Sequence, residues 1–495
     1  MANKTQIILN PLTLNKVKDG VRLPTYDRSE IKTGIFHFGV GGFHRAHQAL
    51  IMDNLFTMGL AKDWGICGVG IMPVDQKMRD VMRDQNCLYT LVEKESSGQL
   101  NYRVIGSIIE YIYAPDDVNA LIERLTKPEA RIVSLTITEG GYNTNPVTGE
   151  FDLSLVQDDL KNPKNPKTVF GIVVEALKRR KERGVSGFTI MSCDNLQENG
   201  KIAKKSFLSF AEAIDKDLST WIEKNVTFPC SMVDRITPVT TEVDRLKISE
   251  KLGVVDQWPV VCEPFIQWVL EDDFAAGRPT YEKNIVQLVK NVAPYELMKL
   301  RLINAGHQAI AYFGLLLDHF YVHEATQNDQ IVKYLQSYMD FEATSTLDPV
   351  DGIDLNQYKS TIIKRFQNPN VLDTLARLAV DGSDRIPKFV IPVIEDRLTK
   401  CESVWLSTSV VVSFTRYLNG VDDKGKKIQI VDRMNEKLSV LDKKLRKDPT
   451  AISDAQEIFG DVVKNKIFIS TFKEIYEKLQ NEGAKKTLDW LLSKY

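Results

Sequence analysis

The feature that most constrains the fold is an alternation of short apolar runs with helical patterns in the N-terminal part of the chain. The apolar runs lie at 35–38, 65–71, 131–137 and 188–192, and helical patterns lie at 45–58 and 169–183. Strands that are covered on both faces read as near-continuous apolar runs, and strand–helix alternation is typical of a parallel sheet. We therefore predict an α/β domain with helices on both faces of a parallel sheet.

The character of the sequence changes near residue 290. From about Pro294 onward helical periodicity dominates, and proline suits the first turn of a helix. The length of 495 residues suggests two or three domains at about 150 residues each. We predict an α/β domain over 1–290 and a mostly helical domain over 291–495.

Charge and cysteine content exclude several classes of function. The chain has 64 basic and 66 acidic side chains and a formal net charge of -2, so no strong field favours nucleic acid or an acidic membrane. Its six cysteines form no Cys-x-x-Cys pair, which argues against a closed zinc site and suits a reducing compartment. Neither a signal core nor an apolar stretch of about 20 residues is present in the sequence. We expect a cytoplasmic protein without nucleic-acid or membrane partners.

A glycine-rich segment follows the first predicted strand and precedes a helical pattern. Glycines at such a junction let the backbone approach a pyrophosphate, which then sits against the helix N-terminus. The third glycine of the usual G-x-G-x-x-G pattern is replaced by His44. A tight turn with no role in cofactor binding would account for the same residues. The place at the first strand–helix junction favours the cofactor site. Its predicted residues are Gly39, Val40, Gly41, Gly42, Phe43 and His44.

Polar residues also follow the other predicted strands. Asp75, past the second strand, is the candidate for the ribose hydroxyls of a dinucleotide, and a carboxylate there favours NAD over NADP. Lys77 and Arg79 weaken that preference because they can pair with a 2′-phosphate, and Asp75 can instead be a loop residue or a helix N-cap. Glu139 and Asn195 follow later strands and are expected to line the same crevice, although each is also a common turn residue.

The stretch 295–307 is predicted to form one helix with a polar face. Lys299, Asn304 and His307 fall at about 0°, 140° and 80° if each residue advances by about 100°. An amine, an amide and an imidazole on one face can move a proton and hold a polar oxygen. An amphipathic helix whose polar side meets water explains the same pattern.

Several segments in order resemble the polyol-specific long-chain dehydrogenases, from Gly34 to the last helices. They are GVGGFHRAHQ at 39–48, SLTITEGGY at 134–142, MSCDNL at 191–196, MVDRITP at 232–238, VCEPFIQWVLED at 261–272 and the helix at 295–307. The resemblance implies an N-terminal Rossmann-type domain that binds NAD, a mostly helical C-terminal domain, and an active site in the cleft between them. It implies metal-independent oxidation of a sugar alcohol, with a polyol or ketose as substrate in a monomer or weak oligomer.

The resemblance also assigns catalytic roles. Lys299 matches the catalytic lysine of the family, and Asn304 and His307 match residues that bind and polarise the reacting oxygen. Asn195 matches a partner in that role. Glu296 matches a carboxylate that helps proton exchange with solvent.

The resemblance also assigns substrate contacts, and two positions differ from the usual pattern of the family. Asp234 and Arg377 match contacts to substrate hydroxyls. Arg385 stands where the mannitol-specific members usually carry lysine, and the two side chains are not equivalent. Val74, beside Asp75, departs from members with two adjacent acids, which bears on the cofactor preference.

The hypothesis for the reaction is reversible oxidation of D-mannitol to D-fructose, with Lys299 as the base. Free lysine has a pKa of about 10.4, and burial together with the cationic nicotinamide is expected to depress it. A zinc ion could take this role, but no plausible ligand set appears: His319 and His323 are four residues apart on a predicted helix, with no third ligand in view.

Other functions explain parts of the pattern. Within the same chemistry, a hexuronate oxidoreductase of the fructuronate or tagaturonate type is the first alternative, and arabinitol or sorbitol are alternative polyols. A non-catalytic NAD-binding sensor and a structural or partner-binding protein are further alternatives. The set of Lys299, Asn304 and His307 argues against the sensor, and an NADH oxidation assay with fructose separates it from an enzyme.

Overall fold

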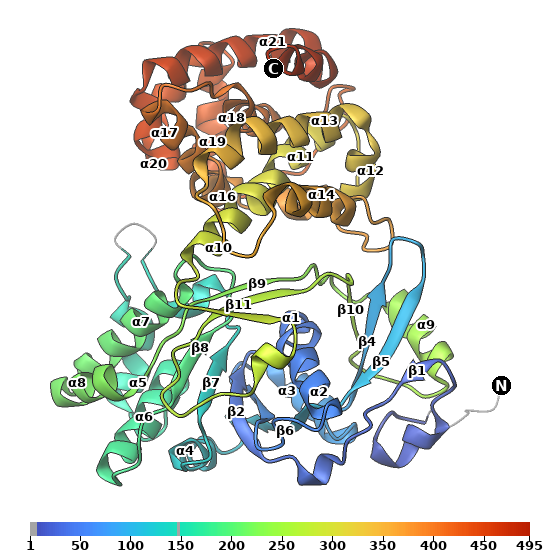
Figure 1. Cartoon of the computed structure of the whole chain (residues 1–495). Helices are drawn as coiled ribbons and strands as arrows, with labels where there is room; N and C mark the ends of the chain where they lie inside the picture. Colours follow the sequence, from blue (N-terminus) through green and yellow to red (C-terminus); the bar gives the residue numbers. More distant parts are fainter. Residues whose placement is uncertain (1–6, 146–148) are drawn as a thin grey trace. The chain divides into compact units, whose positions relative to one another are not determined.

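The computed structural model describes residues 7–145 and 149–495. The chain forms two compact units, residues 1–293 and 294–495 (Figure 1). Each unit has its own core and is described by itself below.

A five-stranded sheet forms the centre of the first unit. Its strand order is β6-β3-β2-β7-β8, and every neighbouring pair is parallel. The strands are β2 (Thr33–Phe38), β3 (Gly65–Gly70), β6 (Ile108–Tyr113), β7 (Ile132–Leu135) and β8 (Thr189–Ser192). In order of appearance these are strands 3-2-1-4-5, the arrangement of dinucleotide-binding Rossmann domains. The predicted parallel sheet is confirmed.

Alternating strand residues bury two separate cores on the two faces of this sheet. Phe36, Val133 and Ile190 face a core completed by α4 (Val118–Thr126), α6 (Val169–Glu182) and α7 (Asn199–Ile214). Ile35 and Ile132 face the opposite core, which α2 (Gln48–Thr57) completes. Successive side chains of a strand point to opposite faces, so continuous apolar runs are needed when both faces are covered.

Smaller sheets and further helices surround this centre (Figure 1). One sheet has the order β1-β5-β4-β10 and the other has the order β12-β11-β9. Their strands are β1 (Val21–Arg22), β4 (Tyr89–Lys94), β5 (Leu100–Ile105), β9 (Ser231–Asp234), β10 (Val260–Cys262), β11 (Gln267–Glu271) and β12 (Val286–Val289). The other helices are α1 (Gly42–Ala46), α3 (Asp75–Asp84), α5 (Gln157–Lys161), α8 (Lys216–Asn225) and α9 (Glu242–Leu252).

The second unit is helical throughout the elements that the structure assigns to it. It begins with α10 (Ala293–Lys299), the π-helical segment η6 (Leu300–Asn304) and α11 (Ala305–Leu316). The remaining α-helices are α12 (Val322–Gln327), α13 (Asp329–Ser337), α14 (Leu355–Phe366), α15 (Leu375–Ala379), α16 (Gly382–Phe389), α17 (Ile391–Thr399), α18 (Trp405–Tyr417), α19 (Asn435–Leu445), α20 (Gln456–Phe459) and α21 (Lys466–Leu492).

Two of these helices form the centre of the second unit. α11 packs against α12, α13, α15, α16 and α18. α18 is buried at every residue after Trp405. A helix that is buried on all sides belongs to a core rather than to a surface. Because α11 contains the last residues of the predicted segment 295–307 and continues beyond it, a buried part of the unit anchors that segment.

The structure corrects several predicted boundaries. The predicted helix 45–58 is two helices, because the backbone at His47 leaves the helical region with φ -120° and ψ -88°. The predicted strand 131–137 ends at Leu135. The Thr136 amide still bonds to the Phe38 carbonyl of β2, but the amides of Ile137 and Thr138 bond to the side chain of Asp194 instead of a neighbouring strand. β6, the edge strand of the central sheet, was not predicted at all.

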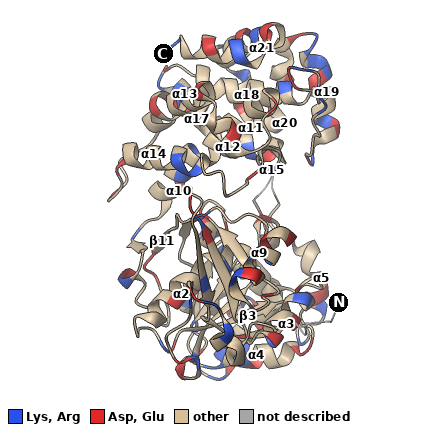
Figure 2. Cartoon of the chain, turned by 90° about the vertical axis from the view of Figure 1, so that its right-hand side faces the viewer, with Lys and Arg blue, Asp and Glu red and all other residues tan. Residues whose placement is uncertain are grey.

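Charged residues of both signs are interspersed along both units (Figure 2). Over the described residues, no helix is long and apolar enough to cross a membrane.

Candidate active site

The glycine-rich segment forms the sharp turn between β2 and α1. Gly39 has φ 90°, and a Cβ there would lie 2.1 Å from the carbonyl oxygen of Thr136. Only glycine fits such a close approach. At Gly41, a Cβ would meet nothing nearer than the Gly39 carbonyl oxygen at 3.9 Å. The space beside Gly41 is therefore open, as the approach of a pyrophosphate to the backbone requires.

The other predicted residues of this segment are held by packing. Val40 is buried, Gly42 begins α1, and the Phe43 ring stacks on His47 with centroids 4.9 Å apart. The His44 ring is 1% exposed and stacks on the ring of His37 at 3.4 Å. The His44 side chain therefore belongs to the core below the turn, and its predicted contact with a cofactor stays a prediction.

His37, within β2, ties the turn to the end of β7. Its Nδ1 lies 2.8 Å from Ser134 Oγ, and its Nε2 lies 2.9 Å from Thr136 Oγ1. The Thr136 hydroxyl in turn donates to the Gly39 carbonyl at 2.6 Å. Burial lowers the pKa of His37 to about 3 and lowers that of His44 well below its usual value. Both rings are therefore neutral near pH 7.

Asp75 stabilises the turn that follows β3. It is the first residue of α3, and its Oδ2 accepts hydrogen bonds from the backbone amides of Ile71 and Met72 at 2.9 and 2.8 Å. The structure thus supports a local role for Asp75, and its ribose contact stays a prediction. Of the two cations weighed against NAD, Arg79 is bound to Asp116, with Nη1 2.8 Å from Oδ1.

The second of those cations, Lys77, is placed beside an aromatic ring. Its Nζ lies 4.8 Å from the centroid of the Trp258 ring.

Glu139 and Asn195, predicted to share a crevice, lie on segments that one buried carboxylate connects. Both residues are exposed. Asp194, which precedes Asn195, accepts hydrogen bonds from the amides of Ile137 and Thr138, just before Glu139. The carboxyl ends of β7 and β8 are therefore joined side by side, as neighbouring parallel strands require. Asp194 was not predicted as a site residue.

Asp234 ends β9 and is 7% exposed. It lies opposite Gln267 in the antiparallel pair of β9 and β11. The next residue, Arg235, is buried and donates to the carbonyl of Glu263 at 2.9 Å. Asp234 is thus placed on a well-fixed strand end, and its contact with a substrate hydroxyl stays a prediction.

The predicted catalytic helix is continuous but is not α-helical throughout. Five residues, Leu300–Asn304, form a π turn between α10 and α11. A π turn closes hydrogen bonds to the fifth residue instead of the fourth, so each residue advances by less than 100°. The predicted angle of about 140° between Lys299 and Asn304 is therefore wrong and too large. The smaller advance also brings His307 closer to the direction of Lys299, and π turns occur often at functional sites.

The side chains on this segment are largely enclosed. Lys299 and Glu296 are 8% and 5% exposed, whereas Asn304 and His307 are half-buried. The His307 ring stacks on Phe366 with centroids 4.3 Å apart. An amine, a carboxylate, an amide and an imidazole thus lie along one helical segment, and they are the groups that proton transfer to and from a hydroxyl needs.

Two arginines predicted to bind substrate lie on neighbouring short helices. Arg377 on α15 forms a bidentate pair with Asp373, with Nη2 2.5 Å from Oδ2. Arg385 on α16 donates from Nη1 to the carbonyl oxygen of Leu378 at 3.2 Å. The same carbonyl accepts from Gln308, the residue after His307, at 3.1 Å. Arg385 and α11 are therefore connected through one shared acceptor.

The structure does not support the alternative of a zinc site at His319 and His323. His319 lies in the turn after α11, whereas His323 lies in the first turn of α12, so the two are not on one helix as predicted. In residues 7–145 and 149–495, no group of three or more His, Cys, Asp or Glu side chains is arranged to hold a metal ion.

Comparison with known proteins identifies the family. Residues 33–283 match the model of the mannitol dehydrogenase Rossmann domain, and residues 291–480 match that of the mannitol dehydrogenase C-terminal domain. The chain belongs to the mannitol dehydrogenase family. The predicted resemblance, the predicted fold of a Rossmann-type domain with a helical C-terminal domain, and the class of oxidoreductase are thereby confirmed.

Relatives match over nearly the full length. A mannitol dehydrogenase of Saccharomyces cerevisiae is 43% identical over 97% of this chain and 96% of its own. A mannitol 2-dehydrogenase of Aspergillus fumigatus is 41% identical over 94% and 95%.

Two solved structures resemble the whole chain. The ternary complex of Pseudomonas fluorescens mannitol 2-dehydrogenase with NAD and D-mannitol has a TM-score of 0.88 and 43% identity, covering 99% of this chain and 100% of that one. A substrate-free D-sorbitol dehydrogenase has a TM-score of 0.90 and 36% identity, covering 97% and 100%.

Proposed function

We propose that this protein is an NAD-dependent polyol dehydrogenase that interconverts D-mannitol and D-fructose. The observation that carries the proposal is the likeness, over the entire chain, to an enzyme solved in complex with NAD and D-mannitol. Relatives named mannitol 2-dehydrogenase in several fungi support the same substrate.

The glycine turn fits a dinucleotide. The open space beside Gly41 admits a pyrophosphate, while Gly39 keeps the turn close to β7. The residues proposed to hold the cofactor are Gly39, Val40, Gly41, Gly42, Phe43, His44, Asp75, Glu139 and Asn195. NAD supplies the hydride acceptor for polyol oxidation when it is bound.

Lys299 is the proposed general base. Oxidation of a secondary alcohol requires the hydroxyl proton to leave as the carbon loses hydride, and a positioned amine can take that proton. Lys299 is only 8% exposed, so little of its side chain meets bulk water. Asn195, Asn304 and His307 are the proposed donors to the developing alkoxide, and such donors act where charge appears in the transition state. Glu296 is proposed to return the proton to solvent.

Three residues are proposed to bind the remaining substrate hydroxyls. Asp234 is a fixed carboxylate acceptor, and Arg377 and Arg385 are donors. Because Arg377 is already paired with Asp373, its guanidinium is held in a defined plane. A fixed guanidinium favours a polyol whose hydroxyl groups match that plane, so these arginines are the proposed source of substrate choice.

We further propose that the reaction needs no metal ion. The support is the absence of a ligand cluster among the described residues and the presence of a buried lysine that can serve as base. Treating the enzyme with EDTA should leave turnover unchanged. Loss of activity that added zinc restores would contradict the metal-free mechanism.

The substrate is tested by a panel of polyols and ketoses with NAD(H) and NADP(H), followed at the absorbance of NADH. The expected result is the highest kcat/KM with D-fructose and NADH, and with D-mannitol and NAD in the reverse direction. A higher kcat/KM with fructuronate or tagaturonate would instead assign a hexuronate oxidoreductase. Absence of turnover with every pair, despite NADH binding, would favour a non-catalytic sensor.

D-Sorbitol is the second candidate substrate, because a D-sorbitol dehydrogenase matches the fold as well as the mannitol enzyme does. The identity is lower, at 36% against 43%. D-Mannitol and D-sorbitol differ in the configuration at one carbon, so a comparison of their kcat/KM values separates the two proposals.

A further inference from the structure

Asp194 lies where the ends of three strands meet in the first unit, and none of the proposed roles uses it. It follows β8 by two residues and is 8% exposed. Its Oδ1 accepts the amide of Thr138 at 2.8 Å, and its Oδ2 accepts the amide of Ile137 at 3.0 Å. The hydroxyl of Tyr142 also donates to Oδ2, at 2.7 Å. Both carboxylate oxygens are therefore engaged by one loop, residues 137–142.

This loop has a backbone conformation that requires an external support. Thr138 has φ 67° and ψ 166°, in a region that is populated almost only by glycine. Such a conformation is unfavourable for a non-glycine residue and persists only where the surrounding structure holds it. Hydrogen bonds to an ionised carboxylate are among the stronger ones in proteins. The bond from the Thr138 amide to Asp194 thus stabilises the residue whose backbone is strained.

The backbone of Asp194 is also hydrogen-bonded, through the side chain of Asn199. The side-chain Nδ2 of Asn199 donates to the Asp194 carbonyl at 3.0 Å and to the Ser231 carbonyl at 2.7 Å. The Ser231 amide donates back to Asn199 Oδ1 at 2.9 Å. Asp194 therefore connects the loop after β7 with the start of β9.

We propose that Asp194 is a positioning residue that holds the loop 137–142 and the adjacent Asn195 in the geometry needed for the reaction. The inference rests on the proposed function, in which Glu139 and Asn195 contact cofactor and substrate. Asp194 itself does not touch the reacting groups in this assignment. Its effect on the reaction comes through the two segments that it joins.

Asp194→Asn tests the proposal because it preserves shape while replacing one acceptor by a donor. Asn has a single carbonyl oxygen, so its NH2 group must face either the Thr138 amide or the donors at Oδ2. A misplacement of reacting groups by about 1 Å can cost about 10²-fold in rate. We expect kcat/KM for ketose reduction to fall by about 10–100-fold.

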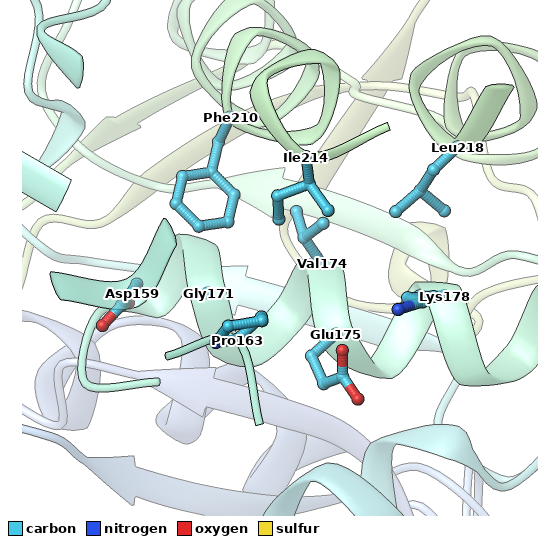
Figure 3. A pocket seen from close by; sticks show the side chains of 9 residues that line it. All are labelled: Asp159, Pro163, Gly171, Val174, Glu175, Lys178, Phe210, Ile214 and Leu218. Atoms are coloured by element: carbon cyan, nitrogen blue, oxygen red, sulfur yellow. The ribbon is translucent and has the colours of Figure 1, made fainter. Parts of the chain in front are cut away.

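The chain offers a matched control in Asp159 on α5. Its Oδ1 accepts the Lys167 amide at 2.7 Å, and its Oδ2 accepts the amide and hydroxyl of Thr168 at 2.8 and 2.6 Å. Asp159 is 1% exposed and, with Gly171, lines a small pocket (Figure 3). It therefore matches Asp194 in burial and in the donors to each oxygen, but none of its partners belongs to the proposed site.

Asp159→Asn should lower stability about as much as Asp194→Asn while keeping kcat/KM within about twofold of the wild type. Amide hydrogen exchange should become faster over 137–142 in the Asp194 variant only. Equal losses of kcat/KM in the two variants, or an Asp194 variant with wild-type kcat/KM, would overturn the proposal.

A milder variant keeps the test decisive if Asp194→Asn does not fold. Tyr142→Phe removes one of the three donors, and we expect a smaller fall of kcat/KM, about threefold or more, with faster exchange over 137–142. Unchanged kcat/KM in this variant would overturn the proposal in that case. A wild-type enzyme that is inactive on every substrate would refute the proposed function, whereas the exchange data would still show whether Asp194 holds the loop.

Discussion

The sharpest test of the glycine turn is Gly39→Ala. The wild-type backbone has φ 90° at this position, and the added Cβ would lie 2.1 Å from the Thr136 carbonyl oxygen. Ordinary carbon–oxygen contacts are more than an ångström longer, so the turn or the end of β7 must move. The clash cannot be relieved by rotating a side chain, because the added Cβ is bonded directly to Cα and the Thr136 oxygen belongs to the backbone.

The magnitude follows from two separate costs. A left-handed backbone costs an L-residue about 1–2 kcal/mol relative to glycine. Moving Thr136 away also disturbs its amide bond to Phe38, at 3.0 Å, and its hydroxyl bond to the Gly39 carbonyl, at 2.6 Å. Two hydrogen bonds contribute about 1–3 kcal/mol. The expected loss in the free energy of unfolding is about 2–5 kcal/mol.

Gly98 supplies a control that isolates the first cost. It lies in the turn between β4 and β5 with φ 88°, and a Cβ there would meet nothing within 4 Å. Gly98→Ala should therefore lose only about 1–2 kcal/mol. Urea unfolding followed by circular dichroism gives both values, and a titration of NADH fluorescence shows whether the turn still binds the cofactor. Equal losses of stability for the two variants would refute the claim that close approach to Thr136 requires glycine at position 39.

Three further predictions concern the cofactor, the base and pH. Gly41→Ala should change the free energy of unfolding by less than about 1 kcal/mol, because φ -83° suits any residue. It should nevertheless weaken NADH binding at least about tenfold in a fluorescence titration, since the methyl group occupies the space left for the pyrophosphate. Unchanged NADH binding would place the cofactor elsewhere. Lys299→Ala should lower kcat by at least about 10²–10⁴-fold with little change in NADH affinity, and near-normal turnover would rule out Lys299 as base. Burial lowers the pKa of His37 to about 3, below about 6.5 in the unfolded chain, so the unfolded state binds the proton first. Stability is then complete above about pH 6.5 and falls by about 1.4 kcal/mol per pH unit as the pH drops toward 3. His37→Gln should make urea midpoints less dependent on pH in that range, and an unchanged dependence would contradict the buried neutral state of His37.

Periodicity in the sequence predicted the central sheet well because both of its faces are covered. Strands such as 35–38 and 65–70 are buried at every position and are therefore apolar at almost all of them, which is a pattern that the sequence shows directly. β6 was missed because its polar and aromatic residues, IIEYIY, suit an edge strand with one exposed side. Its assignment depends on pairing with β3, a contact between residues that are far apart in the sequence.

In the candidate site too, local sequence patterns predicted some features, whereas others depend on contacts between distant segments. The glycine turn and the helix containing Lys299 were predicted from local patterns and from resemblance, and their proposed roles still await experiment. Asp194 and His37 escaped notice because a single aspartate after a strand and a single histidine within an apolar run carry no periodic signal. Their partners, Thr138 and Thr136, follow a different strand, so only the pairing of β7 with its neighbours reveals them.

The amino-acid sequence by itself determined the class of fold, the family and the residue types available for proton transfer, because these depend on local pattern and on motif order. Tertiary structure alone decided that the turn at Gly39 presses against Thr136, and that Asp194 supports a strained loop. It also decided that the helix carrying Lys299 contains a π turn, which changes the angle between Lys299 and Asn304. The physical reason is that close approach, burial and strain arise between segments brought together by folding, and linear spacing along a helix predicts directions only if its winding is known.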